Sequence, residues 1–339
     1  MTARPRTRLT LSALGAVAAV TLTACGGSGS GDTSSDAKAS TSPAAPKGAV
    51  TPAEASKIVD AYEKVNSKAN ATQDEKLLST VEGGQVHEQS KSDYTTFKTW
   101  SKEDQQDYKK PFTYTDREYY IPADEDWFAV KATASGTKTP GMFVFAKESK
   151  ESTGTGAWKM VSAIYSDTPI PKIDTSNDGL ATAVTPTTRV GTLAPNDISA
   201  AFEDLYATGG KKAATALTQT TEPAKSALKT YKERNDGNLS QYATKNFFAK
   251  TPAYDTTYAL RLADGGVLAI VPTSHTSETL LKEKYRSAFT ITPNDTESVY
   301  DPTKRVIITD TFQGILLATL PKSGKPSVIA SEYGMTDSK

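Results

Sequence analysis

The sequence has few of the residues that most often carry chemistry. Among 339 residues it holds one cysteine, Cys25, and two histidines. A single cysteine excludes an intramolecular disulfide, and it excludes a metal site built from several thiolates. Lys and Arg together equal Asp and Glu in number, so the chain lacks the excess positive charge that binding to a nucleic-acid backbone requires. We therefore expect no nucleic-acid partner.

Motifs for catalysis and phosphate binding are missing from the body of the chain. It has no Gly-x-Ser-x-Gly elbow, no Gly-x-x-x-x-Gly-Lys loop and no Gly-x-Gly-x-x-Gly fingerprint. The densest carboxylate cluster, Asp124-Glu125-Asp126, lacks the later glycine and glutamate of an EF-type calcium loop. We interpret it as a charged turn, and we expect no metal, no cofactor and no catalytic residues.

The two histidines form no recognisable metal or catalytic pattern. His87 is followed by Glu88, without the second histidine that a zinc-binding helix requires. His275 lies in the polar stretch 273–276, just past the end of a predicted strand. We interpret both as solvated surface side chains.

One pattern keeps an enzymatic alternative open. Ser226 and Lys229 match the Ser-x-x-Lys of penicillin-interacting serine enzymes, and Lys322-Ser323-Gly324 resembles their later Lys-Thr-Gly element. No Ser-x-Asn element lies between them, and the second match falls in a predicted hairpin turn. We interpret these matches as chance.

The amino terminus has the order of an export signal. Arg4, Arg6 and Arg8 precede an apolar run from Leu9 to Ala24. This run is short for a membrane span, which takes about 20 apolar residues. We predict a signal peptide over residues 1–24.

The signal ends in Leu22-Thr23-Ala24-Cys25, which resembles the lipobox of bacterial lipoproteins. That resemblance implies cleavage before Cys25, recognition of the cleavage site through Leu22, Thr23 and Ala24, and a diacylglycerol on the Cys25 sulfur. Residues 25–50 that follow are rich in Gly, Ser and Ala, and we predict a disordered tether. The expected location is the extracytoplasmic face of the cell membrane, with the membrane as a partner through the lipid anchor.

Hydrophobic periodicity predicts an α+β domain over residues 51–170. Thr51-Pro52-Ala53-Glu54 favours a helix start, with Ile58 and Tyr62 on one apolar stripe. After Pro111 the period falls from that of a helix to two, which indicates strands. The predicted helices are 52–70, 73–81 and 94–108, with a helix break at Gly83-Gly84 between the last two. The predicted strands are 113–121, 127–134, 141–147 and 158–166.

The second half repeats this order. We predict a linker over 171–195 and a second α+β domain over 196–335, with Asn196 capping its first helix. Asp264-Gly265-Gly266 gives the strongest hairpin signal in the chain. The predicted helical stretches are 213–231 and 277–285, and the predicted strands are 254–262, 267–271, 286–292, 304–310, 312–320 and 326–333.

Helices followed by an antiparallel sheet in each half define the predicted fold class, α+β with two similar domains. This order of elements resembles nuclear-transport-factor-two-like domains in plan. The whole chain is similar to uncharacterised actinobacterial cell-envelope lipoproteins, with their Ala/Thr-rich signal, lipobox, Gly-Ser tether and helix opening on Thr-Pro. Neither resemblance carries catalytic residues.

Aromatic residues crowd residues 94–128, where they could line a groove or fill a core. Tyr108, Tyr114 and Tyr120 neighbour Lys, Asp and Pro, so we expect these three to be partly exposed and name them as candidate ligand contacts. The resulting prediction is a non-enzymatic binding or scaffolding lipoprotein, with an envelope protein, peptide or glycan as partner. The alternatives are a solute-binding subunit of a transporter and a cell-wall-directed hydrolase.

Overall fold

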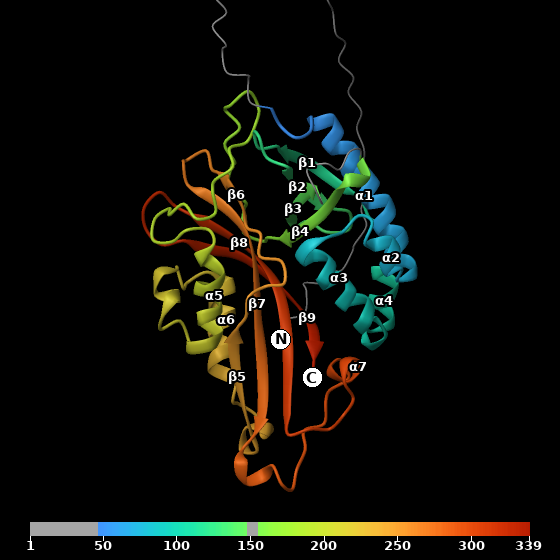
Figure 1. Ribbon diagram of the computed structural model, residues 1–339, viewed down its shortest axis with the longest axis vertical. Coiled ribbons are helices and arrows are strands. Elements are labelled where there is room, and N and C mark those ends of the chain that lie inside the picture. Colours follow the sequence, from blue (N-terminus) through green and yellow to red (C-terminus); the bar gives the residue numbers. More distant parts are fainter. Residues whose placement is uncertain (1–46, 148–154) are drawn as a thin grey trace, which may run out of the picture.

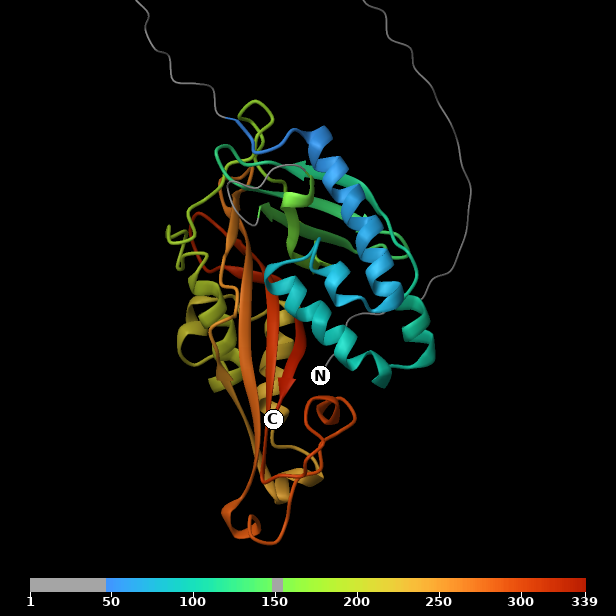
Figure 2. The same cartoon turned by 45° about the vertical axis from the view of Figure 1, so that its right-hand side comes forward.

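The computed structural model describes residues 47–147 and 155–339. Two antiparallel sheets pack face to face, and helices cover the outer face of each sheet (Figures 1 and 2). The predicted α+β class is therefore confirmed. Cys25, the proposed signal peptide and most of the proposed tether lie outside the described residues.

The first half places helices on a four-stranded meander in the order β1-β2-β3-β4. The predicted strands of this half are confirmed to within one residue at each end. Its helices are α1 (Pro52–Thr72), α2 (Glu75–Leu78), α3 (Gly84–Thr96) and α4 (Lys102–Tyr108), and its strands are β1 (Tyr114–Tyr120), β2 (Trp127–Ala134), β3 (Pro140–Lys147) and β4 (Trp158–Tyr165).

Local sequence explains the start of α1. The Thr51 amide donates to the Glu54 carboxylate at 2.7 Å, and the Glu54 amide donates to the Thr51 hydroxyl at 3.3 Å, so the predicted capping pair forms. The next helices were predicted less well. Residues 73–81 hold only the short α2, and α3 begins at Gly84, where a helix break was expected.

The second half builds its sheet in the order β5-β7-β8-β9, with β6 beside one end of β7. The predicted hairpin is confirmed, because β6 pairs with β7 across the turn that contains Gly265, whose φ is 82°. The elements are α5 (Asp197–Thr208), α6 (Glu222–Glu233), α7 (Glu297–Tyr300), β5 (Ala243–Ala249), β6 (Tyr258–Arg261), β7 (Val267–Leu281), β8 (Ile307–Leu320) and β9 (Ser327–Ser338).

The predicted helix over 277–285 is wrong, because β7 continues to Leu281. Ser277 faces Phe247 of β5 on one side and Asp310 of β8 on the other, so this segment is a central strand. Backbone pairing with two neighbours overrides a helix-compatible local pattern. The predicted strand 286–292 is also wrong, since these residues form turns with one isolated bridge at Ile291.

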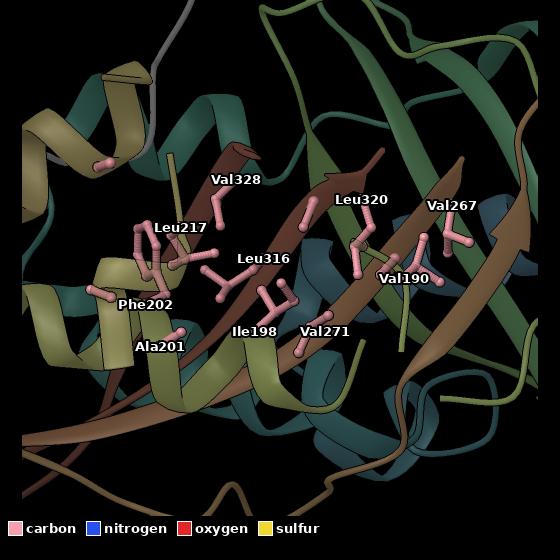
Figure 3. Close-up of a cluster of buried hydrophobic side chains, with 14 of the residues drawn as sticks. Val190, Ile198, Ala201, Phe202, Leu217, Val267, Val271, Leu316, Leu320 and Val328 are labelled. Carbon is pink, nitrogen blue, oxygen red and sulfur yellow. The ribbon is translucent and has the colours of Figure 1, made fainter. Parts of the chain in front are cut away.

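The core of the second half lies between its sheet and helices α5 and α6. Figure 3 shows Phe202 and Ile198 of α5 against Leu316 of β8 and Val271 of β7. All four side chains are buried to 1% exposure or less. Burial of an apolar side chain of this size contributes about 1.5–3 kcal/mol, so this layer holds α5 to the sheet.

A second core lies between the two sheets and is shared by both halves. It combines Met142 and Ile164 of the first sheet with Ile315 and Leu317 of the second, each fully buried. Residues 171–195 also contribute, since Ile173 is 1% exposed within this core. The segment predicted as a linker thus packs between the halves along this part of its length.

A bulge in β1 sets which tyrosines face which layer. One extra residue interrupts the β1–β2 register between Thr115 and Glu118, and Asp116 there has a φ of 53°. Tyr114 consequently packs on the helix side of the sheet, and Tyr120 packs in the core between the sheets. The expected exposure is wrong for both, since they are 6% and 7% exposed.

Candidate functional site

A cavity of about 480 Å³ opens where the two halves meet. Helix α3, strands β3 and β4, the segment 254–258 and Pro272 of β7 supply its walls. Cavities of this size suit a small organic ligand, and junctions between packed units are a common place for them. We take this junction cavity as the candidate site.

The start of α3 forms one wall of the junction cavity. Gly83 precedes the helix, no side chain caps it, and its first turn carries no acidic residue. Amide groups in the first turn of a helix lack intrahelical acceptors and carry partial positive charge. This end of α3 therefore favours an anionic group.

Glycine is required where α3 begins. Gly84 has a φ of 56°, and a Cβ there would lie 3.1 Å from the Val161 carbonyl oxygen of β4. A larger residue would be strained and would push the helix away from the sheet. The Gly-Gly pair was thus the sequence signal for this site, although we interpreted it as a helix break.

Gln85 links α3 to the second half. Its Nε2 donates to the Thr273 and Gly314 carbonyl oxygens at 3.3 and 3.2 Å. These two bonds fix the orientation of the amide, so its Oε1 is left as an acceptor. The residue is 3% exposed and lines the cavity, and within the described residues its Oε1 has no hydrogen-bond partner.

His87 follows two residues later on the same cavity wall. Its Nδ1 is buried and has no partner within the described residues. Burial, assisted by the Lys91 ammonium, lowers the pKa of His87, so the ring is neutral at pH 7. Our interpretation of His87 as a solvated surface histidine is therefore wrong, because the ring is half-buried at a cavity.

Charged and phenolic groups complete the lining, which also includes the buried Glu82. Lys147 ends β3 with its Nζ 5.3 Å from the centre of the Trp158 ring, and Lys159 projects from β4. Tyr254 is 47% exposed at the cavity, and burial raises the pKa of Tyr258 to about 12, so that phenol keeps its proton. With two lysines and the start of α3 against the one carboxylate of Glu82, these groups suit a small anion that also carries hydroxyl groups.

A separate polar centre lies inside the second half. Glu203 of α5 accepts from the Tyr333 hydroxyl at 2.7 Å and from the Thr273 hydroxyl, and it pairs with His275. Our interpretation of His275 as a solvated loop residue is wrong, since it lies within β7 and is 5% exposed. This centre joins α5 to β7 and β9, and the junction cavity does not include it.

The three candidate tyrosines do not meet at one site. Tyr108, which ends α4, contacts the Trp100 ring at 5.1 Å and the Phe97 ring at 5.9 Å, whereas Tyr114 and Tyr120 lie in two different cores. None of them lines the junction cavity. Of the residues that do line it, sequence reasoning noted His87 and the Gly83-Gly84 pair but assigned neither to a site, because the lining comes from segments far apart in the chain.

Comparison with known proteins agrees with the lipoprotein expectation. Residues 46–339 match a family described as a domain of unknown function, DUF8094. A protein of Streptomyces coelicolor named an uncharacterized lipoprotein is 31% identical over 317 residues, which cover 90% of this chain and 86% of that protein. No solved structure matches the chain. Because the family match includes every residue that the structure describes, the chain belongs to the DUF8094 family.

Proposed function

We propose that this chain is a lipoprotein anchored through Cys25 on the extracytoplasmic side of the cell membrane, and that its body binds a small ligand without transforming it. The name of the Streptomyces relative supports the anchor. Within residues 47–147 and 155–339, no helix combines the length and apolar character needed to cross a bilayer.

The observation that carries the binding proposal is the buried acceptor of Gln85. A buried polar atom without a hydrogen bond costs about 1–3 kcal/mol. Gln85 lines the cavity, and its buried Oε1 has no partner in the described chain, so a donor from outside the protein that reached this atom would stabilise the arrangement. We propose a ligand hydroxyl as that donor.

The other residues that line the cavity restrict the class of ligand further. The start of α3, Lys147 and Lys159 attract negative charge, and Tyr254 offers an exposed ring face. Aromatic faces give large contact area at a low entropic cost. A sugar acid supplies the carboxylate, the hydroxyl donors and the apolar ring face that these groups require, and we propose this class of ligand.

The test is calorimetric titration of the chain from residue 26 with galacturonate, and with neutral galactose as the matched ligand. Lys147→Met should weaken galacturonate binding about tenfold through loss of charge. Thr256→Trp, at the exposed rim of the cavity, should abolish binding by blocking entry. Lys64→Met on α1 is the control for an exposed charge.

Equal affinity for galactose and galacturonate would contradict the anionic specificity. Full binding by the Thr256→Trp variant would contradict the location. The lipid anchor has its own test, because Cys25→Ala should move the protein from the detergent-rich to the aqueous phase in a phase-partition experiment. If the Cys25→Ala variant stayed in the detergent-rich phase, the proposed lipid anchor would be contradicted.

A transporter subunit is the nearest alternative. Solute-binding subunits use alternating strand and helix units around parallel sheets, whereas both sheets here pair antiparallel throughout. This difference favours a binding lipoprotein of another architecture.

We also propose that the halves are two similar domains of nuclear-transport-factor-two-like plan. Each half places helices ahead of an antiparallel sheet, and β4 and β9 are edge strands at matching positions.

A further inference from the structure

The end of the second sheet carries an exposed aromatic surface, which we call the tip. It is formed by the segment 238–242 before β5 and the segment 282–289 after β7. Figures 1 and 2 show these gold and orange segments at the bottom of the molecule, beyond the ends of the long strands. The tip includes Leu239, Tyr242, Tyr285 and Phe289.

Large apolar side chains are unusually exposed there. Among the described residues, Leu239, Tyr242 and Phe289 are 47%, 41% and 52% exposed, and they are three of the five large hydrophobic residues with such exposure. The rings of Tyr242, Tyr285 and Phe289 contact one another with centres 5.1 to 6.1 Å apart. Exposed apolar side chains gathered in this way mark an interaction surface more often than isolated ones do.

Positive charge surrounds the rings. Lys282, Lys284 and Arg286 lie within five residues of the chain, interrupted only by one carboxylate at Glu283. None of the three cations forms an ion pair within the part of the chain that the structure describes. The Lys284 Nζ lies 4.8 Å from the centre of the Tyr285 ring, so charge and aromatic face are presented together. The charge of the tip is complementary to a polyanion.

Hydrogen bonds preorganise the tip. The Lys282 amide donates to the Tyr242 carbonyl oxygen at 2.8 Å, and the Lys282 ammonium donates to the Ser240 carbonyl oxygen at 2.7 Å. The Phe289 amide donates to the Tyr285 carbonyl oxygen at 2.9 Å. The two segments are therefore tied to each other, so binding a partner would cost little ordering entropy.

The position of the tip indicates where its partner lies. The start of the described chain, the blue segment before α1, lies at the top of Figure 1, and the tip occupies the opposite end. On the proposed tether, which spans about 25–30 Å as a random coil, the tip would point away from the anchoring membrane. A polymer of the wall is better placed to reach it than a lipid surface.

We infer that the tip docks an anionic polysaccharide, with Lys284 and Arg286 contacting its carboxylate groups and the Tyr242 and Phe289 rings packing against its sugar rings. This surface is separate from the junction cavity and shares no residue with it. The lipoprotein would then hold the membrane at one end and a wall polymer at the other.

The experiment measures binding of the chain from residue 26, which contains every described residue, to immobilised polygalacturonate, with uncharged dextran as the matched polymer. We expect binding to polygalacturonate alone, weakened by salt. Lys284→Gln combined with Arg286→Gln should lower the affinity about tenfold. Phe289→Ser should lower it about threefold.

The control pair is Lys64→Gln with Lys68→Gln, which removes the same charge from exposed positions on α1 and should leave binding unchanged. Thr256→Trp, at the cavity, should also leave polymer binding unchanged. The cavity proposal and the tip proposal can therefore be contradicted independently of each other. Equal losses from both charge pairs, or no binding to polygalacturonate, would overturn the inference. Stronger binding to phosphatidylglycerol vesicles than to the polymer would replace it with a membrane contact.

Discussion

The Nδ1 atom of His275 lies 2.8 Å from Oε2 of Glu203, and this pair joins β7 to α5 inside the second half. Glu203 is 1% exposed and His275 is 5% exposed. Four aromatic rings surround the imidazole, those of Tyr206, Phe247, Phe312 and Tyr333. Burial and the adjacent Glu203 raise the pKa of Tyr333 well above its usual value, so its hydroxyl keeps the proton that it donates to Glu203.

Glu203→Ala should therefore destabilise the chain by about 3–5 kcal/mol, because it leaves His275, Tyr333 and Thr273 without their shared acceptor. Urea unfolding followed by circular dichroism gives the value. The control is Glu222→Ala, which removes an 85% exposed carboxylate paired with Lys225 and should cost less than about 1 kcal/mol. Comparable losses in the two variants would show that the buried network contributes no more than a surface pair.

The core between the sheets should make the two halves unfold together. Leu317 is fully buried in that core, so Leu317→Ala should cost about 2–5 kcal/mol. The three tryptophans belong to the first half, but Trp127 lies in the shared core against Tyr258 of β6. Fluorescence is therefore measured in a Trp127→Phe background, which leaves Trp100 and Trp158 as reporters on the first half. The fluorescence midpoint should fall together with the calorimetric transition, although the Leu317 substitution lies in the second half. Two separated transitions would show instead that the halves are thermodynamically independent.

The bulge in β1 gives a test of backbone strain. Asp116 has a φ of 53°, a region that glycine adopts without a Cβ penalty. Asp116→Gly should be neutral or stabilise the chain by up to about 1 kcal/mol, and Asp116→Val should destabilise it by about 1–3 kcal/mol. Thermal unfolding of the two variants measures the difference. If valine were tolerated as well as glycine, the bulge would not be held in this conformation.

The buried carboxyl group of Asp310 should make the stability of the fold depend on pH. Asp310 is 1% exposed in β8 and accepts from the Ser338 hydroxyl at 2.8 Å, and burial raises its pKa above the ordinary value of 3.8. A raised pKa in the folded state means that the protonated form is favoured there. The protonated Asp310 carboxyl therefore contributes its full share to the free energy of unfolding below pH 3.8. This contribution is lost as the pH rises through the folded-state pKa.

Asp310→Asn keeps an acceptor for Ser338 and carries no charge. The variant should be more stable than the parent at pH 7, by about 1 kcal/mol or less, and the difference should vanish near pH 3. Urea midpoints at the two pH values measure this. A variant that was less stable at pH 7 would show that the Asp310 carboxylate is stabilised by Arg305 rather than penalised by burial.

Local signals in the sequence were sufficient for several elements. The capping pair at Thr51 and Glu54 located the start of α1, and alternation of apolar residues located β1 to β4. The glycines at 265 and 266 located the β6–β7 hairpin. Each of these depends on interactions within a few residues, which is why a pattern reveals them.

The proposed lipid anchor also follows from a short stretch of sequence, ending at Cys25. The sites in the body of the chain do not. The extra residue at Asp116 separates Tyr114 from Tyr120, and pairing with β5 and β8 makes a strand of Ser277. A bulge and a long-range strand pairing depend on what the distant chain presents, so no local period encodes them.

The same reason explains why the polar sites escaped prediction. Glu203 and His275 are 72 residues apart, and Gln85 binds a carbonyl oxygen 229 residues away. The sequence by itself determined the class of fold, the positions of most elements and the expected location at the membrane. Only the tertiary structure decided which polar groups are buried together, because that depends on how the two sheets stack and where α3 crosses between them.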